Sequence, residues 1–165
     1  MIIFLNGSIN SGKSTAAKLL AEKISNSAIV EIDALRDMIA WMQIDQAVPI
    51  NLENAVAVIR IFTKHGISCI VPYPLSEKNH AYMTDALAGI GTPIHYFTLA
   101  PSIETALSDR GGRKLDGVER DRIKRHYAIG IHTPSFGTTI DNSKRTPQET
   151  VEIILASIDL ERHNI

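Results

Sequence analysis

Short apolar runs alternate along the chain with longer stretches in which apolar residues recur every three or four positions. The runs predict five β-strands, at residues 1–5, 28–32, 67–71, 93–99 and 136–140. The other stretches predict helices at residues 14–23, 33–42, 52–65, about 77–88, from 101, about 118–129 and from 147. Such alternation is typical of an α/β fold, a parallel sheet with helices on both faces. The sequence therefore predicts one α/β domain over residues 1–165, with the carboxyl ends of its strands along one edge.

Two local signals set the expected limits of the helices near residue 50. Pro49 interrupts the helical pattern, and Asn51 is a suitable N-cap for a separate helix over residues 52–65. In the preceding segment Met38 and Met42 lie at helical spacing, with Trp41 beside them. We expect these three side chains to pack their helix against the rest of the domain.

The composition and charge of the chain argue against some classes of binding partner but do not identify one. The formal net charge of −1 gives no indication of nucleic acid or an anionic membrane as a partner. No apolar run approaches the roughly 20 residues needed to cross a bilayer, and the N-terminal strand lacks the basic flank of a signal peptide. Cys69 is the only cysteine and lies in an apolar run, so we expect a buried hydrophobe in a cytoplasmic protein.

Residues 7–14 fit the phosphate-loop pattern G-x-x-x-x-G-K-[ST], between a predicted buried strand and a predicted helix. Glycine at these positions permits a backbone whose N–H groups point at an anion, and the positive end of the helix adds to the same field. Lys13 is expected to reach the β- and γ-phosphates of a nucleotide, and Ser14 to coordinate Mg²⁺. The residues expected to bind the nucleotide here are Gly7, Asn10, Ser11, Gly12, Lys13, Ser14 and Thr15.

Asp33 stands at the end of the second predicted strand, three residues before Arg36. A carboxylate close to the γ-phosphate could accept the proton of an attacking hydroxyl or hold a Mg²⁺-bound water. Arg36, about one helical turn further on, could hold an acidic group of the substrate. Asp33 could also cap the helix that it begins, and the two roles are compatible.

A glycine-rich, basic segment at about residues 109–118 lacks an apolar period and is expected to form a lid. Arginine on such a segment could close over a triphosphate and neutralise the charge of the transition state. We assign this role to Arg110 and Arg113, with a solvated basic surface as the alternative. That alternative is preferred for three arginines on the next helix, Arg120, Arg122 and Arg125.

Two turns at the same edge of the sheet complete the candidate site. The first, Pro72-Tyr73-Pro74, follows the central strand and contains no acid, although many phosphate-loop proteins place one there. Tyr73 could line the pocket of a phosphoryl acceptor or belong to a purely structural turn. The second, residues 141–147, leaves the last strand near the phosphate loop and could lie against a purine ring. The histidines show no ligand spacing with cysteine or acids, so we expect no zinc site.

With these residues assembled, the chain resembles the small phosphate-loop kinases of metabolites, the group that includes shikimate kinase, gluconate kinase, adenylylsulfate kinase and chloramphenicol phosphotransferase. The resemblance rests on residues 7–15, on Asp33 with Arg36, on Arg110 with Arg113, and on residues 141–147 before a closing helix. It implies a three-layer α/β/α fold with the strand order 2-3-1-4-5, acceptor-side helices at about residues 34–65 and a lid over ATP.

The same resemblance implies a role for each matching residue. Asp33 would be the general base or a partner of the metal, and Arg113 would lie near the transferred phosphate. The positions implied at the base of the nucleotide are Arg110, near adenine, and Arg145 and Pro147, in the turn before the last helix.

The leading hypothesis is therefore an ATP- and Mg²⁺-dependent kinase that phosphorylates a hydroxyl of a small molecule. Lys13, Asp33 and Arg113 would be its catalytic residues, and Asp33, Arg36 and Tyr73 would meet the acceptor. The alternative is a regulatory protein that binds ATP without an acceptor of its own, which the missing acid after the central strand favours. A GTP-dependent switch would carry an Asn-Lys-x-Asp motif, and the chain has none.

Overall fold

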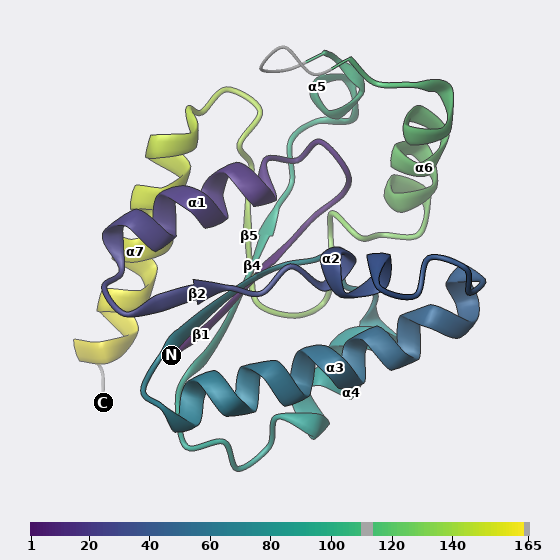
Figure 1. Cartoon of the computed structure of the whole chain (residues 1–165). Helices are drawn as coiled ribbons and strands as arrows, with labels where there is room; N and C mark the ends of the chain where they lie inside the picture. The colour runs from purple at the N-terminus through teal and green to yellow at the C-terminus, as the bar shows by residue number, and fades with distance from the viewer. Residues whose placement is uncertain (110–113, 164–165) are drawn as a thin grey trace.

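The computed structural model of the chain, which describes residues 1–109 and 114–163, has a parallel five-stranded sheet at its centre (Figure 1). The strands lie in the order β2-β3-β1-β4-β5, which confirms the predicted fold class and strand order. They are β1 Ile2–Asn6, β2 Ser27–Ile29, β3 Ser68–Pro72, β4 Ile94–Leu99 and β5 Thr138–Ile140. The helices are α1 Lys13–Lys23, α2 Ile32–Asp37, α3 Ile44–Lys64, α4 Glu77–Ala86, α5 Ile103–Leu107, α6 Gly117–Ala128 and α7 Pro147–His163.

Helices cover both faces of the sheet and divide the core into two apolar layers. Side chains of β1 alternate between the layers: Ile3 and Leu5 pack with residues of α1 and α7, whereas Ile2 and Phe4 pack with residues of α3 and α4. Figure 1 shows α1 and α7 on one side of the sheet and α3 and α4 on the other. The alternation is the two-residue period of a strand, and its apolar residues on both faces make β1 a buried central strand. Within the described ranges, no helix is both long and apolar enough to cross a membrane.

Helix α3 continues through Pro49, so the predicted break at residues 49–51 is wrong. A proline inside a helix removes one backbone hydrogen bond and costs about 3 kcal/mol. Here the buried face of α3 starts at Ala47, before the proline, and continues through Leu52 and Ile59. Burial of that continuous face stabilises one long helix despite the local cost. Asn51, predicted as an N-cap, is a buried residue within the helix.

The chain turns away from the sheet earlier than the sequence suggested. β2 ends at Ile29, and Ile32, predicted as the last residue of the strand, is instead the buried first residue of α2. α2 ends at Asp37, so the predicted helix over residues 33–42 is too long. Met38 and Trp41 are 78% and 80% exposed, and the prediction that they pack against the domain is wrong.

Candidate functional site

The loop between β1 and α1 has the backbone that its glycines predict. Gly7, Asn10 and Gly12 have φ angles of 133°, 60° and 97°, in the region that side chains rarely adopt. A Cβ atom at Gly7 would lie 2.4 Å from the carbonyl oxygen of Leu99 and 2.7 Å from Ser11 Oγ. Position 7 therefore admits only glycine in this conformation, because β4 lies directly against the loop.

Lys13 holds its ammonium group inside this loop. Lys13 Nζ donates to the carbonyl oxygens of Gly7 at 2.9 Å and Ser8 at 2.6 Å. The turn after β5 supports the loop from outside, where Asn142 Nδ2 donates to the carbonyl oxygen of Ser11 at 2.9 Å. The result is a cationic group within a ring of backbone, an arrangement suited to a phosphate.

A cavity of about 710 Å³ opens in front of the loop, at the carboxyl edge of the sheet. Eight predicted site residues line it, namely Asn10, Gly12, Lys13, Ser14, Thr15, Asp33, Arg145 and Pro147. Gly7 and Ser11 are buried and do not line the cavity, so their contribution is to the shape of the loop. The cavity thus brings together three segments that are far apart in the sequence: the loop, the start of α2 and the turn before α7.

Glu31 lines the same cavity as Asp33 and was missed by the sequence reasoning. Burial raises the pKa of Glu31 above its ordinary value, the negative charge of Asp33 raises it further, and Lys13 and Lys18 oppose the shift. Two carboxylates therefore line one cavity, and the loop lysine acts on that of Glu31. The Glu-x-Asp spacing in the sequence was the available signal. The prediction placed Glu31 within a strand, whereas it occupies the N-cap position of α2 without a side-chain capping bond. Asp33 does not cap the helix, because it lies inside it.

Tyr73 and Arg36 lie near Asp33 but do not line the cavity. The side chain of Tyr73 is 8% exposed, and burial raises its pKa to about 12; the charge of Asp33 adds to the shift and that of Arg36 opposes it. The structure therefore brings these three predicted residues into one electrostatic group. At the end of β3 the cavity is lined by Pro72 and Pro74, so this turn offers it no carboxylate.

Helix α6 contributes two charged residues that the sequence reasoning did not select. Glu119 and Arg122 line the cavity, and Arg122 is also exposed, so the expected solvated position of Arg122 is compatible with a place at the cavity. Arg120 instead binds the end of α5, where its Nη1 donates to the carbonyl oxygen of Leu107 at 2.5 Å. Arg110 and Arg113, the predicted lid arginines, lie outside the described residues.

His126, also on α6, contacts the phosphate loop from behind. Its Nδ1 atom lies 3.3 Å from Ser8 Oγ, in a buried part of the loop. Burial lowers the pKa of His126 to about 4, and the positive charges of Lys13, Arg122 and Arg125 contribute to the shift. At neutral pH the ring is therefore uncharged, and it adds no repulsion to the cations around the cavity.

The turn before α7 begins the helix as predicted. The backbone N–H of Glu149 donates to Thr146 Oγ1 at 3.2 Å, and that of Thr146 donates to Glu149 Oε2 at 2.7 Å, which forms a capping box. Arg145 Nε donates to the carbonyl oxygen of Asp141 at 3.1 Å, which folds the turn back on itself. Pro147 and Arg145 both line the cavity.

A divalent cation in this cavity would need ligands beyond carboxylates. Among residues 1–109 and 114–163, no group of three or more His, Cys, Asp or Glu side chains could hold a metal. The donors at the loop are the Ser14 hydroxyl and the carboxylates of Glu31 and Asp33, which all line the cavity. Oxygen donors of this kind fit Mg²⁺, which usually completes its coordination with phosphate oxygens and water.

Comparison with known proteins gives a match at the level of structure. No protein-family model matches the chain, and no curated protein matches its sequence. A sugar kinase from Janibacter sp. superposes with a TM-score of 0.73 and 19% identity, covering 96% of this chain and 94% of its own. An APS kinase from Mycobacterium tuberculosis, solved with AMPPNP and APS, gives a TM-score of 0.70 and 20% identity, covering 96% of each chain. The tunicamycin resistance protein of Deinococcus radiodurans gives 0.69 and 21%, covering 95% of this chain and 94% of its own.

The chain has the fold of the small phosphate-loop kinases. At these identities the likeness shows the fold alone, and it extends over nearly the whole of each chain. Within this kinase fold, the phosphate loop, the α2 acids and the turn before α7 of our chain meet at one cavity. The function therefore has to be argued from those residues.

Proposed function

We propose that the protein is an ATP- and Mg²⁺-dependent kinase that phosphorylates a hydroxyl group of a small molecule. The single observation that carries this proposal is one cavity lined by both the loop lysine, Lys13, and a carboxylate, Asp33. Phosphoryl transfer needs a cradle for the triphosphate, positive charge near the transferred group and a base for the acceptor. The kinase fold of the chain supports the same proposal.

The proposed roles follow from position in the cavity. The backbone of residues 7–13 and Lys13 bind the β- and γ-phosphates, while Arg145 and Pro147 contact the base. Asp33 takes the proton of the acceptor hydroxyl while the hydroxyl oxygen attacks the γ-phosphorus, and the bond from the γ-phosphorus to the β-phosphate oxygen breaks, so that ADP leaves. Arg122 neutralises charge on the transferred group, a role that we also propose for Arg113. Arg36 and Tyr73 lie near Asp33 but outside the cavity lining, and we propose that they position the Asp33 carboxylate for the acceptor.

Mg²⁺ enters the proposal through the oxygen donors at the loop. Ser14 would hold the ion directly and Glu31 would be its carboxylate partner, while Asp33 acts as the base. When bound, the ion offsets the negative charge of the phosphates. Glu31 would thereby supply an acid to a site in which the turn after β3 offers the cavity only Pro72 and Pro74.

An ADP-release assay with a panel of hydroxylated compounds tests the proposal. The panel contains shikimate, gluconate, nucleosides and hydroxylated antibiotics, and the rate is compared with that of ATP alone. The proposal predicts that one compound raises ADP release and that Asp33→Ala abolishes the increase. MgATP binding without stimulation by any compound, together with a stable partner protein, would instead favour a regulatory ATP-binding protein.

A further inference from the structure

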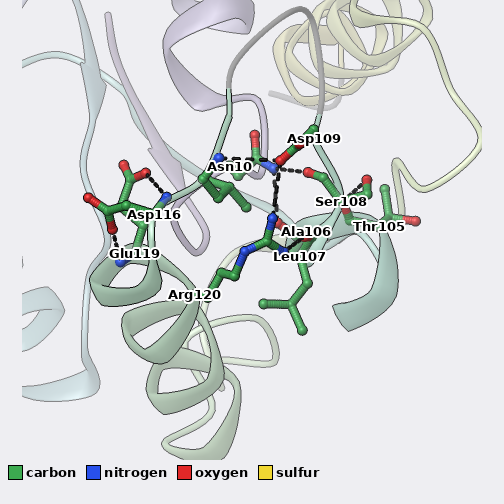
Figure 2. Close-up of polar contacts among 10 residues, drawn as sticks. Asn10, Thr105, Ala106, Leu107, Ser108, Asp109, Asp116, Glu119 and Arg120 are labelled. Carbon is green, nitrogen blue, oxygen red and sulfur yellow. Dashed lines mark hydrogen bonds and ion pairs between the residues drawn. The ribbon is translucent and has the colours of Figure 1, made fainter.

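The end of α5 lies against the phosphate loop, outside the cavity lining described above. Asn10 Nδ2 donates to the carbonyl oxygens of Ala106 and Ser108, both at 2.9 Å (Figure 2). A helix leaves its last carbonyls without intrahelical partners, and Asn10 satisfies two groups at this end. The left-handed backbone of Asn10, with φ of 60°, belongs to the same loop conformation. A shift of α5 would therefore move Asn10 and, with it, the phosphate loop.

Arg120 joins α6 to the same end of α5. Its Nη1 donates to the carbonyl oxygen of Leu107 at 2.5 Å, and its Nη2 donates to Asp109 Oδ1 at 3.2 Å. Asp109 Oδ1 also accepts from the backbone N–H of Leu115 at 3.3 Å. Three successive carbonyls, from residues 106 to 108, are thus bound from two sides, by the loop through Asn10 and by α6 through Arg120.

The ion pair within this junction contributes little energy by itself. The side chains of Arg120 and Asp109 are 40% and 52% exposed, and exposed ion pairs contribute about 0–1 kcal/mol to stability. The planar guanidinium instead fixes the relative position of its partners, because it binds a carbonyl and a carboxylate at once in fixed directions. The junction is therefore suited to fixing the position of α6, with little effect on folding.

The position of α6 matters because the helix carries Glu119 and Arg122 to the cavity, on either side of Arg120 in the sequence. A capping box between Asp116 and Glu119 fixes its first turn. We propose that Arg120 is a positioning residue, which locks α6 to α5 and through Asn10 to the phosphate loop, so that Arg122 and Lys13 face the same terminal phosphate. This inference rests on the proposed function, because it assumes a nucleoside triphosphate in the cavity.

A positioning role predicts a selective loss of affinity. Arg122 lines the cavity together with Lys13, and both positive charges act on His126, so Arg122 lies near the loop lysine. A displaced α6 should therefore weaken contact with the terminal phosphate alone. Arg120→Lys keeps the charge and loses the fork. It should weaken binding of a non-hydrolysable ATP analogue with Mg²⁺ by about tenfold, equivalent to 1.4 kcal/mol. Binding of MgADP should change by less than about twofold, within ordinary mutational scatter. The urea midpoint should be unchanged.

Arg125→Lys is the matched control, since it makes the same chemical change on an exposed position of the same helix. It should leave both affinities unaltered. Asn10→Ala removes the other half of the junction, and the Asn10→Ala/Arg120→Lys double variant should lose less affinity for the ATP analogue than the sum of the single losses, because the two residues act through α5.

The outcomes separate this inference from the proposed function. Selective loss of the ATP analogue in Arg120→Lys supports the positioning role. Equal loss of ATP analogue and ADP, or no loss beyond that of Arg125→Lys, overturns it. If the unaltered protein binds neither nucleotide, the proposed function itself fails.

Discussion

Replacing Gly7 by alanine tests whether the phosphate loop has the close approach to β4 seen in the structure. The new Cβ would lie 2.4 Å from the carbonyl oxygen of Leu99, and a contact under 3.0 Å cannot persist without a shift. Overpacking of this kind costs about 1–3 kcal/mol, and the unfavourable φ of 133° adds about 1–3 kcal/mol. We therefore expect Gly7→Ala to lose about 4 kcal/mol of unfolding free energy, or about 2 M in urea midpoint for a slope of about 2 kcal/mol/M.

Gly89→Ala is the control for this substitution. Gly89 also has a positive φ, of 70°, but a Cβ there would meet no atom within 4 Å. Alanine at position 89 should therefore cost only the backbone strain, about 1–2 kcal/mol. Urea unfolding and titration with MgATP are measured on both variants. MgATP affinity should fall in Gly7→Ala only, and equal stability and equal MgATP affinity in the two variants would refute the reasoning.

Three further predictions concern charged groups around the cavity. Asp33→Asn should lower phosphoryl transfer by about 10²–10⁴-fold, the usual contribution of a general base, with little change in MgATP affinity; unchanged turnover removes Asp33 from the mechanism. Folding lowers the pKa of His126 from 6.5 to about 4, so the contribution of His126 to the free energy of unfolding should be fully present above pH 6.5. It should decline by on the order of 2 kcal/mol towards pH 4. Urea titrations at each pH should show a flatter decline for His126→Gln. The raised pKa of Glu31 gives the opposite dependence of stability on pH. Its stabilising contribution is present at acidic pH and is lost as the pH rises through the pKa of the folded state. Glu31→Gln should therefore raise the urea midpoint at pH 8 and not at pH 4, and an equal shift at both would contradict a titrating Glu31.

The parts of the fold that could be predicted are those set by local pattern. The apolar run of β1, the glycines at positions 7 and 12 and the helix that begins at Lys13 are contiguous, so the sequence alone determined the phosphate loop. The α/β class followed in the same way from the alternation of strands and helices. The capping box at Thr146 and Glu149 is likewise local, and the structure confirmed it.

The misjudged parts depend on tertiary packing. Pro49 has a strong local tendency to break a helix, and only the burial of residues on both sides of it explains why α3 continues. Glu31 looked like part of a strand because β2 ends only two residues earlier and Val30 N–H still donates to the carbonyl oxygen of Ile70 in β3. Arg122 is solvated as expected, but its place at the cavity was not predicted, because the sequence does not reveal how α6 faces the cavity. Trp41 shows the opposite error, an apolar side chain that the fold leaves exposed.

The most direct test of the central claim is to identify the phosphorylated product. The protein is incubated with MgATP and a mixture of hydroxylated small molecules, and the mixture is analysed by mass spectrometry alongside the ADP formed. The account predicts one compound that gains a phosphoryl group in equal amount to the ADP, and no such product with Lys13→Ala or Asp33→Asn. If ADP forms without any phosphorylated compound, or if Asp33→Asn makes the product at the same rate, the cavity described here is not that of a small-molecule kinase that uses Asp33 as its base.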